Sequence, residues 1–328
     1  MGKARSTRNA LPPSERVHPL AEDLDLVPPE EVIRRLHRED VVAVQAVRPA
    51  LRGMARVARS VADALQAGGR LVYVGAGTSG RLGVLDASEC PPTFGTSPTQ
   101  VQAVIAGGPR AMTHAVEGAE DDAEAGTRAM RRLRVGPHDV VCGISASART
   151  PFVRGALQEA RQRGARTVLV CCSPPGPGMD ADEVLLARTG PELVAGSTRL
   201  KAGTATKLIL NALTTTAFVT LGKVYRGRMV DMRPGNTKLR ARAARMVAEL
   251  TDLALPAAQR LLEQAGHEVK VALAMHFAGV SAREARRRLK HSGLRELSAS
   301  PPDRARPAKR PAKGLEKKPA RSPRARRA

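Results

Sequence analysis

The sequence predicts an α/β fold in which a parallel sheet is covered by helices on both faces. Between about residues 70 and 225, short apolar runs bounded by glycine or polar residues alternate with longer stretches of helical periodicity. This alternation is typical of parallel strands joined by right-handed helical crossovers. With 328 residues, 42% of them hydrophobic, the chain can form one such domain with additional elements at its ends.

The apolar runs predict five buried strands, at 71–74, 101–105, 140–144, 167–171 and, more weakly, 184–186. Helical patterns lie between and after them, at about 79–88, 110–117, 121–133, 151–163 and 202–221. Open parallel sheets bind ligands at the carboxyl ends of their strands. The loops after Val74 and Ile144 are therefore expected to carry the functional site.

The flanking segments give the predicted domain organisation. The expected parts are an irregular segment 1–28, N-terminal helices 29–68, the α/β domain 69–225, a small helical C-terminal region 226–298 and a basic tail 299–328. Residues 301–328 contain eleven Lys and Arg, two acids and six Pro, which predicts a disordered tail. Such a tail either binds polyanions non-specifically or is a solvated appendage unrelated to the main function.

Several classes of protein are disfavoured by composition. The N-terminal segment has no apolar core of a secretory signal, and no apolar run is long enough to cross a membrane. The four cysteines have neither a disulfide framework nor zinc-ligand spacing, so a reducing, cytoplasmic compartment is expected. The absence of Trp, with only two Tyr and four Phe, argues against a stacking platform for single-stranded nucleic acid.

Two polar loops follow neighbouring predicted strands. Residues 75–80, GAGTSG, match the pattern of a dinucleotide loop, but no acidic residue ends the next strand to hold a ribose. Hydroxyl groups at a helix N-terminus instead favour a phosphomonoester. Residues 145–150, SASART, are similar and precede a helix starting at Pro151. The candidate phosphate-binding residues are Thr78, Ser79, Ser145, Ser147 and Thr150. The alternative is ordinary N-capping of two helices.

Three segments carry a resemblance to a known family. The run 75–93, GAGTSGRLGVLDASECPPT, resembles that of the N-acetylmuramic acid 6-phosphate etherases. Two further parts of the chain are similar to the same family. One combines AGG at 106–108 with VEGAED at 116–121, and the other is GSTRLKAGTATK at 196–207. The resemblance covers about residues 65–295, and the first run is long and unusual.

The resemblance implies a sugar-isomerase-type (SIS) α/β domain, a helical C-terminal region and a homodimer with sites near the subunit interface. It implies a lyase that cleaves the lactyl ether of N-acetylmuramic acid 6-phosphate to N-acetylglucosamine 6-phosphate and D-lactate, with no metal or organic cofactor. By resemblance, Glu89 is the acid that protonates the departing lactate and Glu120 is the base at C2. Two carboxyl groups in different protonation states suit this elimination.

Other residues are assigned no catalytic role. Arg199 and Lys201 either add positive charge near the site or have a structural or interface role. His114 and His138 are isolated and are expected to be structural, and no metal-ligand pattern is present.

The sequence departs from the family pattern in places. Ala148 stands where family members usually have Gly, and its methyl group is expected to tighten the second loop. The N-terminal segment matches only loosely, at 14–15 and 23–25.

Two rivals share the fold. A non-catalytic sugar-phosphate sensor, like the related glucokinase regulatory protein, needs the loops but not both glutamates. An aldose–ketose isomerase has no lactate to expel. The presence of Glu89 and Glu120 in register favours the etherase.

Overall fold

A five-stranded parallel sheet forms the centre of the molecule, in a computed structural model that describes residues 13, 16–232 and 237–299. The strands are β1 Leu71–Gly75, β2 Val101–Ile105, β3 Val140–Ile144, β4 Arg166–Cys171 and β5 Glu183–Leu186. Their order is β2-β1-β3-β4-β5, with every neighbouring pair parallel. The sequence prediction of the sheet and its five strands is confirmed.

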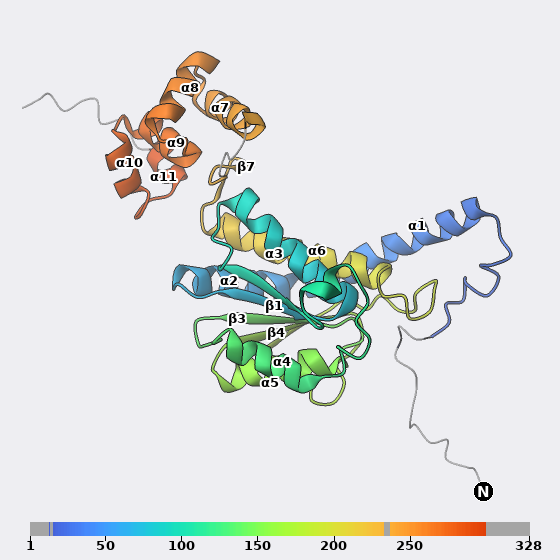
Figure 1. The fold of residues 1–328 in the computed structure, drawn as a ribbon. Coiled ribbons are helices and arrows are strands. Elements are labelled where there is room, and N and C mark those ends of the chain that lie inside the picture. The colour runs from blue at the N-terminus through green and yellow to red at the C-terminus, as the bar shows by residue number, and fades with distance from the viewer. Residues whose placement is uncertain (1–12, 14–15, 233–236, 300–328) are drawn as a thin grey trace, which may run out of the picture.

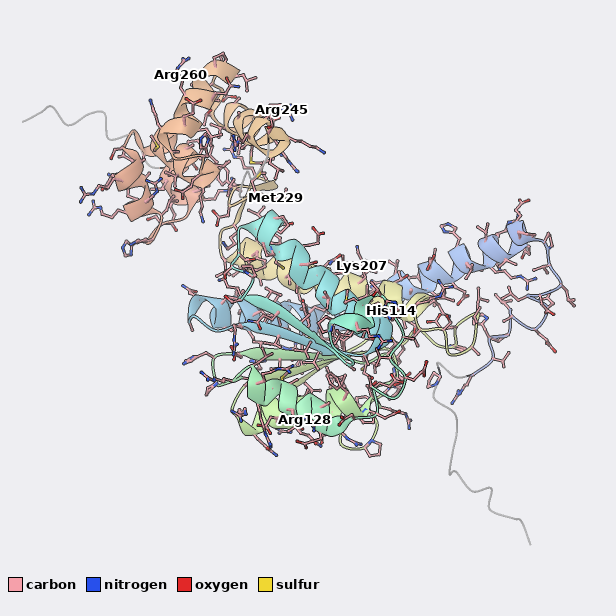
Figure 2. The ribbon with its side chains drawn as sticks, viewed as in Figure 1. His114, Arg128, Lys207, Met229, Arg245 and Arg260 are labelled. Atoms are coloured by element: carbon pink, nitrogen blue, oxygen red, sulfur yellow. The ribbon has the colours of Figure 1, made fainter. Side chains whose placement is uncertain are left out.

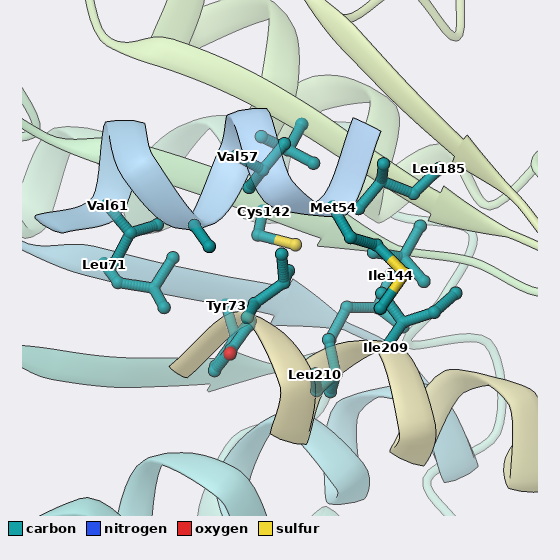
Figure 3. Close-up of a cluster of buried hydrophobic side chains, with 14 of the residues drawn as sticks. Met54, Val57, Val61, Leu71, Tyr73, Cys142, Ile144, Leu185, Ile209 and Leu210 are labelled. Carbon is teal, nitrogen blue, oxygen red and sulfur yellow. The ribbon is translucent and has the colours of Figure 1, made fainter. Parts of the chain in front are cut away.

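Helices cover both faces of the sheet (Figure 1). Helices α2 Leu51–Gln66, α3 Gly77–Phe94 and α6 Lys201–Thr220 pack on one face, and α4 Ala123–Arg132 and α5 Pro151–Gln162 pack on the other. Strand residues alternate between the faces, as the pleat requires. Leu71 and Tyr73 of β1 join the first core, shown in Figure 3, while Val72 and Val74 join the second.

The N-terminal helix extends away from the α/β domain (Figure 1). Helix α1 spans Pro29–Ala46 and is followed by a 3-10 turn, η2 Arg48–Ala50. Only Glu39 and Ala43 of α1 are buried. Large apolar side chains are exposed on it, including Ile33 at 65% and Val44 at 54%.

The C-terminal part has its own hydrophobic core. A short antiparallel ribbon, β6 Val224–Tyr225 and β7 Arg228–Met229, leads into the helices α7 Thr237–Thr251, α8 Leu255–Gln264, α9 Val269–Ala278, α10 Ala282–Arg288 and α11 Leu294–Ala299. Exposed arginines such as Arg245 and Arg260 lie on these helices (Figure 2). The predicted basic tail, 299–328, lies outside the described residues apart from Ala299.

The structure corrects two sequence expectations. The helix expected at 110–117 is only a 3-10 turn, η3 Pro109–Met112, after which the chain runs irregularly to Gly118 at φ +70°. Helix α3, expected to end near 88, continues through Pro91 and Pro92 to Phe94, whose side chain is buried. Among the described residues, no helix is long and apolar enough to cross a bilayer.

Candidate functional site

The two polar loops leave the sheet side by side. Strands β1 and β3 are neighbours, and Gly75 pairs with Ile144 at their carboxyl ends. The chain order reverses here, since β2 lies beyond β1 and β4 beyond β3. Ligands of open parallel sheets bind at such a switch point. Residues 75–80 and 145–150 therefore lie together at one edge of the sheet.

The first loop is shaped by close backbone packing. A Cβ atom on Gly75 would lie 2.7 Å from the Gly80 nitrogen, and one on Gly80 would lie 2.8 Å from the Gly75 oxygen. Helix α3 begins directly after Ala76, which makes no side-chain capping hydrogen bond. Thr78 and Ser79 are half-buried in its first turn. The N-capping alternative is thus wrong for this loop, and the N-terminus of α3 has no side-chain cap.

The second loop is closed by a pair of hydroxyl groups. Ser145 is buried, and its Oγ lies 2.8 Å from Thr150 Oγ1. Thr150 is the N-cap residue of α5 but makes no side-chain cap hydrogen bond, so N-capping is wrong here as well. Ser147 is half-buried between them. Ala148 has φ +53°, the left-handed conformation that Gly adopts more readily.

A third helix also begins beside the first loop. A Cβ on Gly203 of α6 would lie 3.8 Å from Thr78 Cγ2. Here a side chain already occupies the helix end, because Lys201 N and Ala202 N donate to the Glu192 carboxylate at 3.1 and 2.9 Å. Glu192 is 1% exposed, and burial raises its pKa. Of the three helices, α3 offers uncapped N-terminal amides to an anion. Helix α5 begins with Pro151, which has no N–H group, and its Phe152 N donates to the Glu120 carbonyl oxygen.

The Lys201 side chain is buried away from solvent and has a structural partner. Its ammonium forms an ion pair with Glu39 of α1, which also accepts a hydrogen bond from His18 Nε2 at 3.1 Å. Leu20 N donates to His18 Nδ1, so the imidazole proton is on Nε2. The sequence left the role of Lys201 open and gave no sign of Glu39 and Glu192. Glu39 is 162 residues from Lys201 and Glu192 is 9 residues from it, and no sequence motif connects them.

Glu120 lies in a turn that is attached to the start of α5, next to the second loop. Arg81, in the second turn of α3, donates to the carbonyl oxygens of Met112 and His114. Further along the same segment, Phe152 N of α5 donates to the Glu120 carbonyl oxygen at 3.0 Å. The Glu120 side chain is exposed. The structure therefore holds the Glu120 backbone beside the end of the second loop in its own subunit.

Glu89 lies further away on the same helix as the first loop. It follows Thr78 by eleven residues, roughly 17 Å along α3 at about 1.5 Å per residue. Its side chain is exposed, whereas Asp86 and Cys90 on the same helix are buried. The structure does not bring Glu89 to the loops of its own subunit.

The cysteines are poor nucleophiles in this structure. All four are free and buried. Burial raises the pKa of Cys90 to about 12 and that of Cys172 to about 11, so the thiols stay protonated near neutral pH. Within the described ranges, no three His, Cys, Asp or Glu side chains are placed to share a metal ion. The exposed His114 contacts Thr113 Oγ1 at 2.9 Å, and His138 is also exposed.

The chain is similar to several known proteins. Residues 53–161 match the glucokinase regulatory protein N-terminal SIS domain family. An N-acetylmuramic acid 6-phosphate etherase from Salmonella schwarzengrund is 48% identical over 283 residues, covering 86% of this chain and 95% of that protein. Another from Trichormus variabilis is 49% identical over 290 residues, covering 88% and 94%. A phosphoheptose isomerase structure from Neisseria gonorrhoeae has 18% identity and a TM-score of 0.44, covering 58% and 99%.

Proposed function

Because this chain belongs to the N-acetylmuramic acid 6-phosphate etherase family, we propose that it cleaves the D-lactyl ether of N-acetylmuramic acid 6-phosphate. The products are N-acetylglucosamine 6-phosphate and D-lactate. The observation that carries this proposal is the placement of two hydroxyl-rich loops together at the carboxyl ends of β1 and β3, beside the uncapped N-terminus of α3. A phosphate dianion suits both the hydroxyl donors and the positive ends of the helices.

The reaction is an elimination followed by hydration. The ether oxygen is at C3, β to the C1 aldehyde of the open-chain sugar, so the carbonyl acidifies the C2 proton. A base removes that proton, the C3–O bond breaks, and an acid protonates the departing lactate oxygen. Water then adds to the unsaturated aldehyde and restores a hydroxyl group at C3. The protein must supply one ionised and one protonated carboxyl group.

Glu120 is the proposed base at C2. Its turn is attached to the start of α5 through the Phe152 hydrogen bond, and the segment leading to that turn is attached to α3 through the bonds from Arg81 to Met112 and His114. A sugar held by its phosphate in the loops therefore places C2 near this turn. The proposed phosphate ligands are Thr78, Ser79, Ser145, Ser147 and Thr150.

Glu89 is the proposed acid, and geometry favours its action in the site of a partner subunit. In the substrate, C3 and phosphorus are separated by five bonds of about 1.5 Å each, so they lie less than about 8 Å apart. Glu89 is roughly 17 Å along α3 from Thr78. The Glu89 side chain is too short to cover the difference between this distance and the separation of C3 from phosphorus. A homodimer that apposes the exposed face of α3 to the partner's loops supplies the missing acid.

The exposed surface of α1 supports a homodimer. Ile33 and Val44 are among several large apolar side chains that α1 exposes, although the helix is well formed and attached to α6 by the Glu39–Lys201 ion pair. A helix with exposed apolar residues that extends from its own domain suits burial against a second copy.

We place the reaction in the cytoplasm, where four free buried cysteines remain reduced. The basic tail lies almost entirely outside the described residues. Its excess of Lys and Arg supports non-specific binding to polyanions as a property separate from catalysis.

The direct test is D-lactate release from N-acetylmuramic acid 6-phosphate by the wild type, Glu89→Gln and Glu120→Gln. We expect release by the wild type and a loss of about 10³-fold in each variant, within the range of general acid–base catalysis. Saturable binding of the substrate by folded wild type without lactate release would contradict the etherase. It would favour the sugar-phosphate sensor, the alternative that retains the loops without the chemistry.

A further inference from the structure

The turn of α3 that carries Glu89 is weakly held by its own backbone. Helix α3 contains Pro91 and Pro92 in its last turn. Proline has no N–H group, so these residues donate no hydrogen bond to the carbonyl oxygens of Ala87 and Ser88, four residues earlier. The proline rings also crowd those carbonyl groups. Contacts with other elements therefore help to fix the position of Glu89.

One such contact precedes Glu89 by a single turn. Asp86 is 5% exposed and accepts three hydrogen bonds. The donors are Tyr73 Oη on β1 at 2.8 Å, and Asn211 Nδ2 and Thr214 Oγ1 on α6 at 2.6 and 3.2 Å. Hydrogen bonds to a carboxylate are stronger than those between neutral groups. This buried carboxylate thus fixes α3 to the sheet and to α6.

A second contact follows Glu89 by little more than a turn. The Phe94 ring at the end of α3 stacks on Phe218 of α6, with centroids 4.6 Å apart and planes at 29°. Both rings are buried. The contacting residues of α6 are Asn211, Thr214 and Phe218. They are three and four positions apart, so they lie on one face of that helix. Helix α6 therefore holds α3 on both sides of Glu89.

We name these contacts the α6 clamp, formed by Asp86 and Phe94 of α3 with Asn211, Thr214 and Phe218 of α6. We propose that the α6 clamp positions the Glu89 carboxyl group for proton transfer to the departing lactate. Asn211 and Thr214 are then positioning residues for the acid, although neither reaches the substrate. The inference rests on the proposed role of Glu89.

Loosening the clamp should affect lactate release and C2 proton exchange differently. The proposed base, Glu120, is held by the hydrogen bond from Phe152 of α5, which is not part of the clamp, so loosening the clamp leaves removal of the C2 proton intact. In deuterated water, exchange at C2 then continues while lactate release slows. A general loss of structure would reduce both rates together.

The test compares Asn211→Ala with the wild type, using Thr215→Val as the control because Thr215 is an exposed neighbour on the same helix. The measurements are kcat and KM for lactate release, C2 deuterium exchange and the thermal unfolding midpoint. We expect Asn211→Ala to lower kcat by about 10- to 100-fold, as a misplacement of about 1 Å does. We expect unchanged KM and C2 exchange, and wild-type values for Thr215→Val.

A rescue variant adds a second readout. Asp86→Asn combined with Asn211→Asp exchanges the carboxylate and the amide between α3 and α6, and we expect it to recover much of the kcat lost in Asn211→Ala. If Asn211→Ala does not fold, Thr214→Val and Thr214→Ser take its place, since only serine keeps the hydroxyl donor. We then expect a lower kcat for the valine variant alone.

Three results would overturn the inference. The first is a lower unfolding midpoint with unchanged kcat. The second is an equal fall in lactate release and C2 exchange, which would show that the clamp does not act through Glu89. The third is normal release by Glu89→Gln beside an active wild type, which would remove the acid from this helix. Absence of release by the wild type would instead contradict the proposed function itself, and the inference with it.

Discussion

The two glutamates of the proposed site are held in different ways. Glu120 lies in an irregular turn whose own carbonyl group accepts a hydrogen bond from Phe152 at the start of α5. Glu89 lies on a regular helix, but its turn is interrupted by prolines and depends on side chains of α6. The hydrogen bond from Asn211 to Asp86 joins residues 125 positions apart. A backbone contact therefore holds the proposed base, whereas tertiary packing holds the helix that carries the proposed acid.

The largest expected effect separates the two roles. Glu89→Gln and Glu120→Gln should each reduce lactate release by about 10³-fold, because each removes one proton-transfer group. Only Glu120→Gln should also stop deuterium incorporation at C2, since Glu89→Gln retains the base. Proton NMR of the substrate recovered from deuterated water measures this difference. The opposite pattern would exchange the acid and base assignments.

A second prediction tests whether the two regions serve the same site across a dimer. Glu89→Gln and Glu120→Gln subunits, carrying different affinity tags and co-expressed, should form a heterodimer with one intact site and one doubly altered site. We expect about half the activity of a wild-type dimer from this heterodimer, since two-fold symmetry pairs each acid with the partner's base.

The control for this prediction is the pair of parent homodimers, which should remain nearly inactive. If both glutamates act within one subunit, every site of the heterodimer has one defect and no activity returns. A chain that stays monomeric in sedimentation while fully active would also contradict the shared site.

Much of the fold could be predicted from local sequence signals. The five strands are short apolar runs, and their order along the chain alternates with helices, so a parallel sheet follows from packing rules alone. The two loops could be placed at one edge of the sheet because parallel strands end on the same side. Glycines at 75 and 80 also gave a local signal, since only glycine allows the close approach seen there.

Contacts between distant segments could not be predicted in this way. Nothing near Asp86 in the sequence indicates that its partners are Tyr73, Asn211 and Thr214. Prolines predict the end of a helix, yet α3 continues to Phe94 because tertiary packing on α6 outweighs the lost backbone hydrogen bonds.

The smallest expected effect is that of Ala148→Gly, in the second loop, on stability and KM. Ala148 adopts φ +53° in the loop before α5, which costs an L-residue about 1–2 kcal/mol. Ala148→Gly removes that strain, but Gly adds about 0.5–1 kcal/mol of unfolded-state entropy. The lost buried methyl group costs about 0.8 kcal/mol more.

These terms nearly cancel, so Ala148→Gly should change the free energy of unfolding by less than about 1 kcal/mol. Two backbone hydrogen bonds hold the loop, from Ala148 N to the Ser145 oxygen and from Gly176 N to the Ala148 oxygen. The substitution leaves both in place, because neither involves a side chain. We therefore expect KM to change by less than about threefold, well under 1 kcal/mol of binding free energy. Urea unfolding and lactate-release kinetics measure both quantities. A destabilisation above about 1.5 kcal/mol would show that packing of the methyl group, rather than the backbone, holds this loop.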